Sequence, residues 1–213
     1  KIFPGILKNT FSERIFIMIS TGYNQIKWGI LISIIHIYIS TELGGFEIVP
    51  AFIGYFLIMR GTSAICSETN LEYMNSLKAE SLRLFILSCV YWITGIFLGY
   101  GLAIQKLILI VFYLFDVLFF GNLLNKTVKY LKESMRLDDA DKLRKNRMTF
   151  IKCYLALIIF SVIAMIPNAM GFFDIGKVAF RNLLSSGLSY LSISFMLILK
   201  LWLSMVIQKY SIH

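Results

Sequence analysis

The feature that most constrains this chain is its division into about six apolar stretches, joined by loops that alternate between basic and nearly uncharged. Inside a lipid bilayer a backbone satisfies its hydrogen bonds only as a helix or as part of a closed barrel. In helical membrane proteins the cations concentrate in the cytoplasmic loops. The alternation therefore predicts a polytopic helical membrane protein and indicates which of its loops face the cytoplasm.

Composition supports the same class. Hydrophobic residues make up 58% of the chain, mean hydropathy is +0.75, and only 15% of the residues are charged, whereas soluble domains carry about 25% charged residues. The net charge of +9 comes from short loops beside apolar stretches, where membrane topology explains it. We therefore do not expect nucleic acid as a partner.

We predict an all-α, polytopic transmembrane helical bundle of about six spans with both termini in the cytoplasm. The first two uninterrupted apolar runs are shorter than the ~20 residues that a perpendicular span needs. Either Lys27 and Arg60 extend them by snorkelling or the first hairpin is re-entrant. We expect Lys200, in the last span, to snorkel inward. The predicted spans cover residues 28–41, 48 to beyond 59, 84–100, 107–124, 150–166 and 183–207.

Two regions outside these spans have a distinct character. Residues 1–22 partly match a helix with one apolar face and predict an amphipathic segment on the inner leaflet; residues 23–213 then form one transmembrane domain. The cytoplasmic basic loop, residues 126–147, is explained first as a topology signal on a solvated helix that extends from the fourth span. The alternative is docking to anionic lipid or to an acidic protein partner. The cations of this loop are Lys126, Lys129, Lys132, Arg136, Lys142, Arg144, Lys145 and Arg147.

Asp116 is the sharpest candidate for a functional residue. It lies near the middle of residues 107–124, among aliphatic and aromatic side chains. An ionised acid at that depth costs at least ~2.5–3.5 kcal/mol unless it is paired, hydrated or protonated, so we expect it to face the bundle interior. It fits a proton or cation site, or a hydrogen-bonded residue that fixes helix registry. His36, in the first span, is a candidate partner in a proton relay or an interhelical hydrogen-bonding group.

The sequence shows few signs of catalysis. Cys66, Cys89 and Cys153 have no CxxC spacing, so neither a disulfide framework nor a zinc site is expected. A nucleotide-binding loop, a metal-ligand cluster and a nucleophile motif are absent from the sequence. We therefore expect no metal, no cofactor and no enzymatic activity. An intramembrane enzyme acting on lipid or peptide is the least favoured hypothesis, because such enzymes need several converging polar groups.

One local sequence has a recognisable form. Residues 44–61 contain GGFEIVPAFIGYFLI, which resembles a GFxIxPxFIGYxLI hairpin of small, uncharacterised polytopic membrane proteins of bacteria. The resemblance implies a multi-pass protein of the bacterial cytoplasmic membrane and carries no activity with it.

Two functional hypotheses remain for such a protein. The first is a non-catalytic membrane subunit that contributes spans and a cytoplasmic docking surface to a larger transport or export assembly. The second is a self-contained small transporter or channel that uses Asp116 for proton or cation coupling. Fold-level analogy does not separate the two.

Overall fold

The computed structural model describes residues 4–35, 38–41, 44–47, 50–69, 72–98, 103–169, 191–192 and 194–209. Five long helices and a further helix, which we call the 194–209 helix, dominate this part of the chain. The predicted all-α class is confirmed. The long helices are α1 (Pro4–Ile34), α2 (Ala51–Thr69), α3 (Asn75–Leu98), α4 (Ala103–Glu133) and α5 (Leu137–Ala169), with a short 3-10 helix, η1 (Glu72–Met74), before α3.

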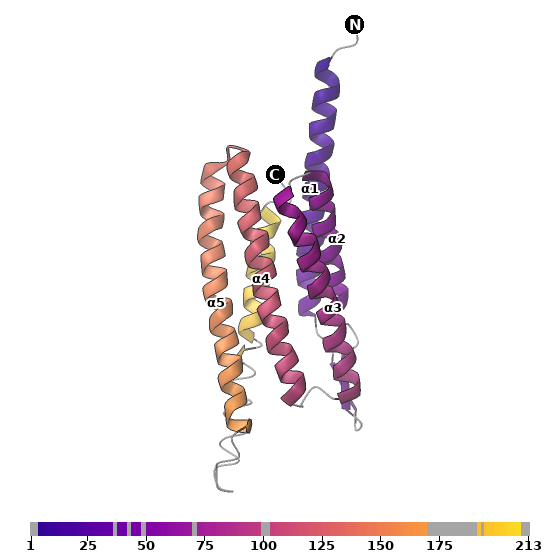
Figure 1. Cartoon of the computed structure of the whole chain (residues 1–213), viewed down its shortest axis with the longest axis vertical. Coiled ribbons are helices and arrows are strands. Elements are labelled where there is room, and N and C mark those ends of the chain that lie inside the picture. Colours follow the sequence, from indigo (N-terminus) through magenta and orange to yellow (C-terminus); the bar gives the residue numbers. More distant parts are fainter. Residues whose placement is uncertain are drawn as a thin grey trace.

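The helices form an antiparallel bundle in which neighbours along the chain pack side by side (Figure 1). Contacts also join helices that are distant in the sequence. The Tyr23 hydroxyl of α1 lies 2.7 Å from the Thr127 hydroxyl of α4, and Lys200 of the 194–209 helix reaches α1, α2 and α4. The 194–209 helix therefore closes the bundle between the first helices and the α4–α5 pair.

Helices α1 and α2 approach so closely that their backbones touch at glycines. A Cβ atom on Gly29 would lie 2.5 Å from the carbonyl oxygen of Gly54, and one on Gly61 would lie 2.5 Å from that of Gly22. The glycines are spaced seven residues apart on each helix, so both pairs lie along one antiparallel seam. Small residues let transmembrane helices pack at this distance.

A short β-hairpin joins α1 to α2 and corrects the first predicted span. Strand β1 (Tyr38–Thr41) pairs antiparallel with β2 (Gly44–Glu47), so α1 ends at Ile34 rather than continuing to residue 41. Residues 34–41 are rich in β-branched side chains, which favour extended backbone. Pro50 immediately precedes α2, where its missing N–H group leaves no helical hydrogen bond unmade.

Helix lengths bear on whether the first hairpin spans the bilayer. Helix α2 has 19 residues, which is about 28 Å at a rise of 1.5 Å per residue, and α1 has 31 residues. Both are longer than the uninterrupted apolar runs within them. Helix α1 is also continuous across residue 22, so residues 4–22 are the first part of a long helix rather than a separate one.

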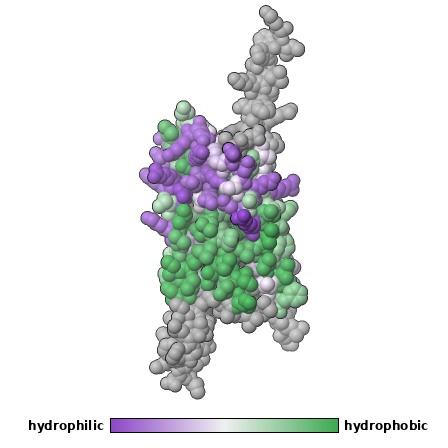
Figure 2. All heavy atoms as spheres, viewed as in Figure 1, coloured by the Kyte–Doolittle hydropathy of each residue, from purple (hydrophilic) through white to green (hydrophobic). Residues whose placement is uncertain are grey.

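The outer surface divides into a polar end and an apolar belt (Figure 2). On α3 the exposed apolar side chains recur at helical spacing, at Ile86, Val90, Ile93 and Phe97, which gives one apolar face. Three helical segments of the described chain are long and apolar enough to cross a membrane: Glu72–Phe97, Leu107–Glu133 and Leu137–Ile163. The architecture is therefore compatible with an integral membrane protein, while six spans and cytoplasmic termini stay predictions.

The basic region predicted as a loop is mostly helix. Helix α4 continues to Glu133 and α5 begins at Leu137, so the connection is a tight turn. Met135 has a positive φ of 58°, and the backbone N–H groups of Met135 and Arg136 donate to the carbonyl oxygens of Lys132 and Leu131. This is the hydrogen-bond pattern of a Schellman C-cap. At its other end α5 continues through Pro167 to Ala169, three residues beyond residue 166, where the fifth predicted span ends.

Candidate functional site

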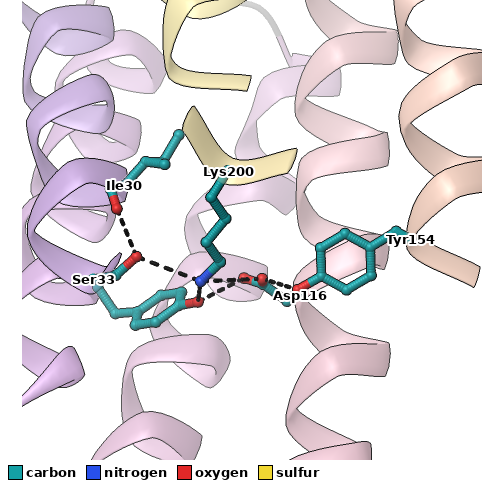
Figure 3. A network of polar contacts seen from close by, with 6 residues as sticks. Ile30, Ser33, Asp116, Tyr154 and Lys200 are labelled. Carbon is teal, nitrogen blue, oxygen red and sulfur yellow. Dashed lines mark hydrogen bonds and ion pairs between the residues drawn. The ribbon is translucent and has the colours of Figure 1, made fainter. Parts of the chain in front are cut away.

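The centre of the bundle holds a buried ion pair. Asp116, from the middle of α4, is fully buried, and Lys200, from the 194–209 helix, is 5% exposed. The Lys200 Nζ atom lies 3.5 Å from Oδ2 of Asp116. Figure 3 shows the Lys200 side chain extending toward the carboxylate between α1 and α4. The acid therefore faces the interior, and it has a cation beside it.

Two tyrosine hydroxyls complete the surroundings of the carboxylate. The Tyr55 hydroxyl of α2 donates to Oδ1 of Asp116 over 2.9 Å, and the Tyr154 hydroxyl of α5 donates to Oδ2. Both tyrosines are almost completely buried. With Lys200, both carboxylate oxygens are engaged by donors or by positive charge. Asp116 therefore meets the requirement that a buried charge be paired and hydrogen-bonded.

The Lys200 ammonium is held by oxygens from three elements. It donates to the Tyr55 hydroxyl over 2.6 Å and to the Ser33 hydroxyl of α1 over 3.4 Å, and its third neighbour is Asp116. The Ser33 hydroxyl in turn donates to the carbonyl oxygen of Ile30, 2.8 Å away. Each hydroxyl thus accepts from Lys200 and donates elsewhere, which makes the network internally consistent (Figure 3).

The α1–α2 glycine seam positions two of these oxygens. A Cβ atom on Gly54 would lie 2.5 Å from the backbone nitrogen of Ser33, so the α2 backbone rests directly against the residue that supplies one hydroxyl. The next residue along α2, Tyr55, supplies the other. The spacing between the two hydroxyls that bind Lys200 therefore depends on the close approach of α1 and α2.

A cavity of about 230 Å³ borders the ion pair. Lys200 is the one charged residue among the described residues that line it, while Asp116 and Tyr154 lie behind its wall. Five hydroxyl-bearing side chains and several apolar ones form the rest of the lining. The hydroxyls belong to Ser33, Tyr55, Ser88, Tyr91 and Tyr113. The cavity therefore presents a positive charge, hydroxyl groups and apolar surface.

The remaining predicted site residues lie elsewhere. His36 is outside the described residues, so its pairing with Asp116 stays a prediction. In the basic region, Lys126 donates to Ser76, Lys129 lies 4.0 Å from Glu133 and Arg136 lies 2.7 Å from Asp139. Arg147 is half-buried, whereas four other cations are exposed at the α4–α5 end of the bundle. These four are Lys132, Lys142, Arg144 and Lys145.

The cysteines take no part in the site. Cys66 is buried and its thiol donates to the Met74 carbonyl oxygen, and Cys89 and Cys153 are half-buried free thiols. Within the part of the chain that the structure describes, no group of three His, Cys, Asp or Glu side chains is placed to hold a metal ion.

Sequence reasoning missed the residues that surround Asp116. Lys200 was expected to snorkel toward a surface; instead it is buried against the carboxylate, because Asp116 and two hydroxyls satisfy its charge inside the bundle. A signal was present, since Asp116 and Lys200 are opposite charges that each lie well inside a long apolar run. Tyr55 and Tyr154 gave no signal, because tyrosine is common throughout this chain.

Comparison with protein-family models, with curated proteins and with solved structures found no match to this chain.

Proposed function

We propose that this chain is a small membrane transporter whose charged centre is the Asp116–Lys200 pair. The observation that carries the proposal is that Lys200, buried against Asp116, also lines a cavity. Charged side chains at membrane depth are costly and mark substrate pathways or proton relays in membrane proteins. If the Asp116–Lys200 ion pair served only to fix the registry of the helices, a cavity beside Lys200 would add nothing to that role.

The orientation of the cavity fits this role. It lies near the C-terminal end of α1 and the N-terminal ends of α2 and α4, whereas the basic α4–α5 turn lies at the opposite end of α4. With the basic α4–α5 turn in the cytoplasm, the cavity lies toward the outer face. We infer that the membrane is the bacterial cytoplasmic membrane, from the resemblance of residues 44–61. Transport requires that the cavity also open to the cytoplasm.

Cysteine labelling tests this alternating access without knowledge of the substrate. Ser88 is buried and lines the cavity. It is changed to cysteine in a chain whose three native cysteines are replaced by serine. We expect Ser88→Cys to react with a small, membrane-impermeant thiosulfonate added to either side of oriented vesicles.

The matched control is Val90→Cys on the same helix. Val90 is 41% exposed on the apolar outer surface, where a charged reagent finds no water, so it is expected to stay unlabelled. Reaction of Ser88→Cys from one side alone, or from neither, would exclude a transport cycle through this cavity.

A second candidate function is a membrane subunit of a transport or export assembly. The observation that favours it is that Lys132, Lys142, Arg144 and Lys145, which lie within 14 residues of one another across the α4–α5 turn, are all exposed, together with three acids of the same segment. Such a cluster suits an acidic cytoplasmic protein, because complementary charge steers association.

Purification of the natively expressed protein in mild detergent, followed by mass spectrometry, tests the subunit hypothesis. A stoichiometric partner should be present and should be lost when the four cations are changed to glutamine. The control changes the exposed Lys78, Arg83 and Lys152 to glutamine instead. A partner-free protein that binds anionic vesicles through the four cations would identify lipid rather than protein as their ligand.

A further inference from the structure

We infer that the cavity beside Lys200 binds a small organic monoanion, namely a carboxylate on an apolar body, and that Asp116 takes up a proton when the anion binds. This inference names the substrate class of the proposed transporter and rests on that function. Three features of the described residues carry it: the sign of the cavity's charge, the geometry around the ammonium, and the enclosure of the acid.

The cavity lining selects an anion rather than a cation. Its charged lining residue in the described chain is Lys200, whereas Asp116 is fully buried and does not line the cavity. The cation coupling expected from the sequence would require a cation to displace those donors. Among the hydroxyls that line the same cavity, that of Ser88 donates to the Phe85 carbonyl oxygen over 2.6 Å, so the ammonium of Lys200 is the group that we expect a carboxylate to contact.

The size and the apolar walls suggest the rest of the ligand. A cavity of about 150 Å³ lined by aliphatic and aromatic side chains holds benzene, and this one measures about 230 Å³. It therefore has room for a ring with one carboxylate. Phe112, Leu109 and Met196 contribute apolar surface to its wall.

The contacts of the ammonium differ in length. Lys200 makes one short hydrogen bond, to Tyr55 at 2.6 Å, while the Ser33 hydroxyl and Asp116 are 3.4 Å and 3.5 Å away. Charge-assisted N–H···O bonds are typically about 2.7–2.9 Å long, so the carboxylate of Asp116 is not at optimal distance from the ammonium. A ligand carboxylate entering from the cavity can approach Nζ more closely than Asp116 does.

Charge balance then requires a proton. Two carboxylates beside one ammonium, at a site enclosed by the bundle, cannot both remain ionised. A proton from water adds to the Asp116 carboxylate and leaves a neutral acid, while the ligand keeps its negative charge against Lys200. The Tyr55 hydroxyl contacts both the Asp116 carboxylate and the Lys200 ammonium. It can turn to accept a hydrogen bond from the protonated carboxyl group of Asp116.

The groups that face this centre are few in the described structure. Asp116 faces Lys200 from the 194–209 helix, Tyr55 from α2 and Tyr154 from α5. Tyr113 of α4 and Tyr91 of α3 lie along the cavity, and α1 contributes the Ser33 hydroxyl. Asp116 is the one carboxylate in this set, so we assign the proton to it.

Calorimetric titration of the purified full chain in detergent tests the inference, with sodium benzoate as the probe. Titrations in two buffers with different ionisation enthalpies give the number of protons exchanged on binding. We expect saturable binding with an uptake of about one proton per benzoate, because one cation balances one carboxylate. Benzyl alcohol, a neutral probe of similar size, should cause no proton uptake.

Variants assign the roles of the two charges. Asp116→Asn should bind benzoate without proton uptake, and Lys200→Met should lose benzoate binding. Lys209→Met, at an exposed position of the same helix, should behave like the unaltered protein. If either single variant fails to fold, the Asp116→Asn/Lys200→Met double variant, which contains neither buried charge, should bind benzyl alcohol but not benzoate.

Each of the following outcomes would overturn a part of this picture. Failure of the unaltered protein to bind benzoate would exclude the anion site, and benzoate binding without proton uptake would exclude coupling through Asp116. Equal benzoate binding by Lys200→Met would place the anion elsewhere. If Ser88→Cys is labelled from both sides but benzoate does not bind, the proposed ligand class is wrong and the transport function stands. If benzoate binds but labelling occurs from one side alone, the transport function is wrong and the anion site stands.

Discussion

The Asp116 carboxylate and the Lys200 ammonium each make burial of the other tolerable. Removing one member of a buried pair leaves an uncompensated charge and costs about 3–5 kcal/mol, whereas removing both can be nearly neutral. We therefore expect Asp116→Asn and Lys200→Met each to lower the free energy of unfolding by roughly that amount. The double variant should lose less than the sum of the two, as measured by unfolding in SDS followed by circular dichroism.

The matched control is a surface pair that uses the same two residue types and the same helix. Lys209 lies 3.9 Å from Asp139, and both side chains are partly exposed to solvent. Exposed pairs couple by about 0.2–1 kcal/mol, so the cycle of Asp139→Asn with Lys209→Met should show a coupling energy within that range. A coupling energy as small as this for Asp116 and Lys200 would mean that their burial does not strengthen the pair, and would contradict the prediction.

The α1–α2 pair depends on the absence of side chains at its seam. A Cβ atom on Gly54 would overlap the Gly29 carbonyl oxygen and the Ser33 backbone, and backbone atoms cannot yield as a flexible side chain can. Overpacking of this kind typically costs about 1–3 kcal/mol. We expect Gly54→Ala to lower the thermal unfolding temperature and to weaken benzoate binding, since Ser33 and Tyr55 both move when the helices separate.

Gly121→Ala on α4 is the control for this substitution. The nearest atoms to its added Cβ would be those of Ile151, at 3.5 Å and 3.6 Å, an ordinary contact distance. Alanine favours a helix interior over glycine by about 1 kcal/mol, so Gly121→Ala should be neutral or stabilising. A Gly54→Ala protein as stable as Gly121→Ala would show that the helices need not touch.

The turn between α4 and α5 contains a residue with a strained backbone. Met135 has a φ of 58° and is largely exposed, so its side chain gains little from burial, while a non-glycine residue in the left-handed region costs about 1–2 kcal/mol. We expect Met135→Gly to raise the unfolding temperature without changing benzoate binding. A lower unfolding temperature would show that the Met135 side chain stabilises the turn.

The whole molecule presents an apolar belt below a polar end, and this division predicts its orientation in the membrane. The exposed cations of the α4–α5 turn belong to the polar end, and such residues remain in the cytoplasm. A single cysteine at Lys132 or Arg144, in the cysteine-free chain, should therefore react with an impermeant reagent only after cells are opened. Reaction in intact cells would reverse the orientation and remove the cytoplasmic docking surface.

Hydropathy was enough to predict the helical class, because long apolar runs report directly on helices in a bilayer. It was not enough for the site. Asp116 could be identified from the sequence because an ionised acid inside a membrane span costs free energy. Its pairing with Lys200 depends on which helices pack against each other, and six helices can pack in several ways. The glycine seam could have been anticipated, since Gly22 and Gly29 have the same spacing as Gly54 and Gly61.

The order of these residues along the chain has a consequence for biogenesis. A ribosome makes Asp116 before either Tyr154 or Lys200, and domains fold from the N-terminus as they emerge. Until the 194–209 helix enters the membrane, the acid lies in α4 without the ion-pair partner that the structure gives it. Docking of that helix is then the event that pairs the buried carboxylate, so we expect the nascent protein to become stable in the membrane only after the 194–209 helix has been made.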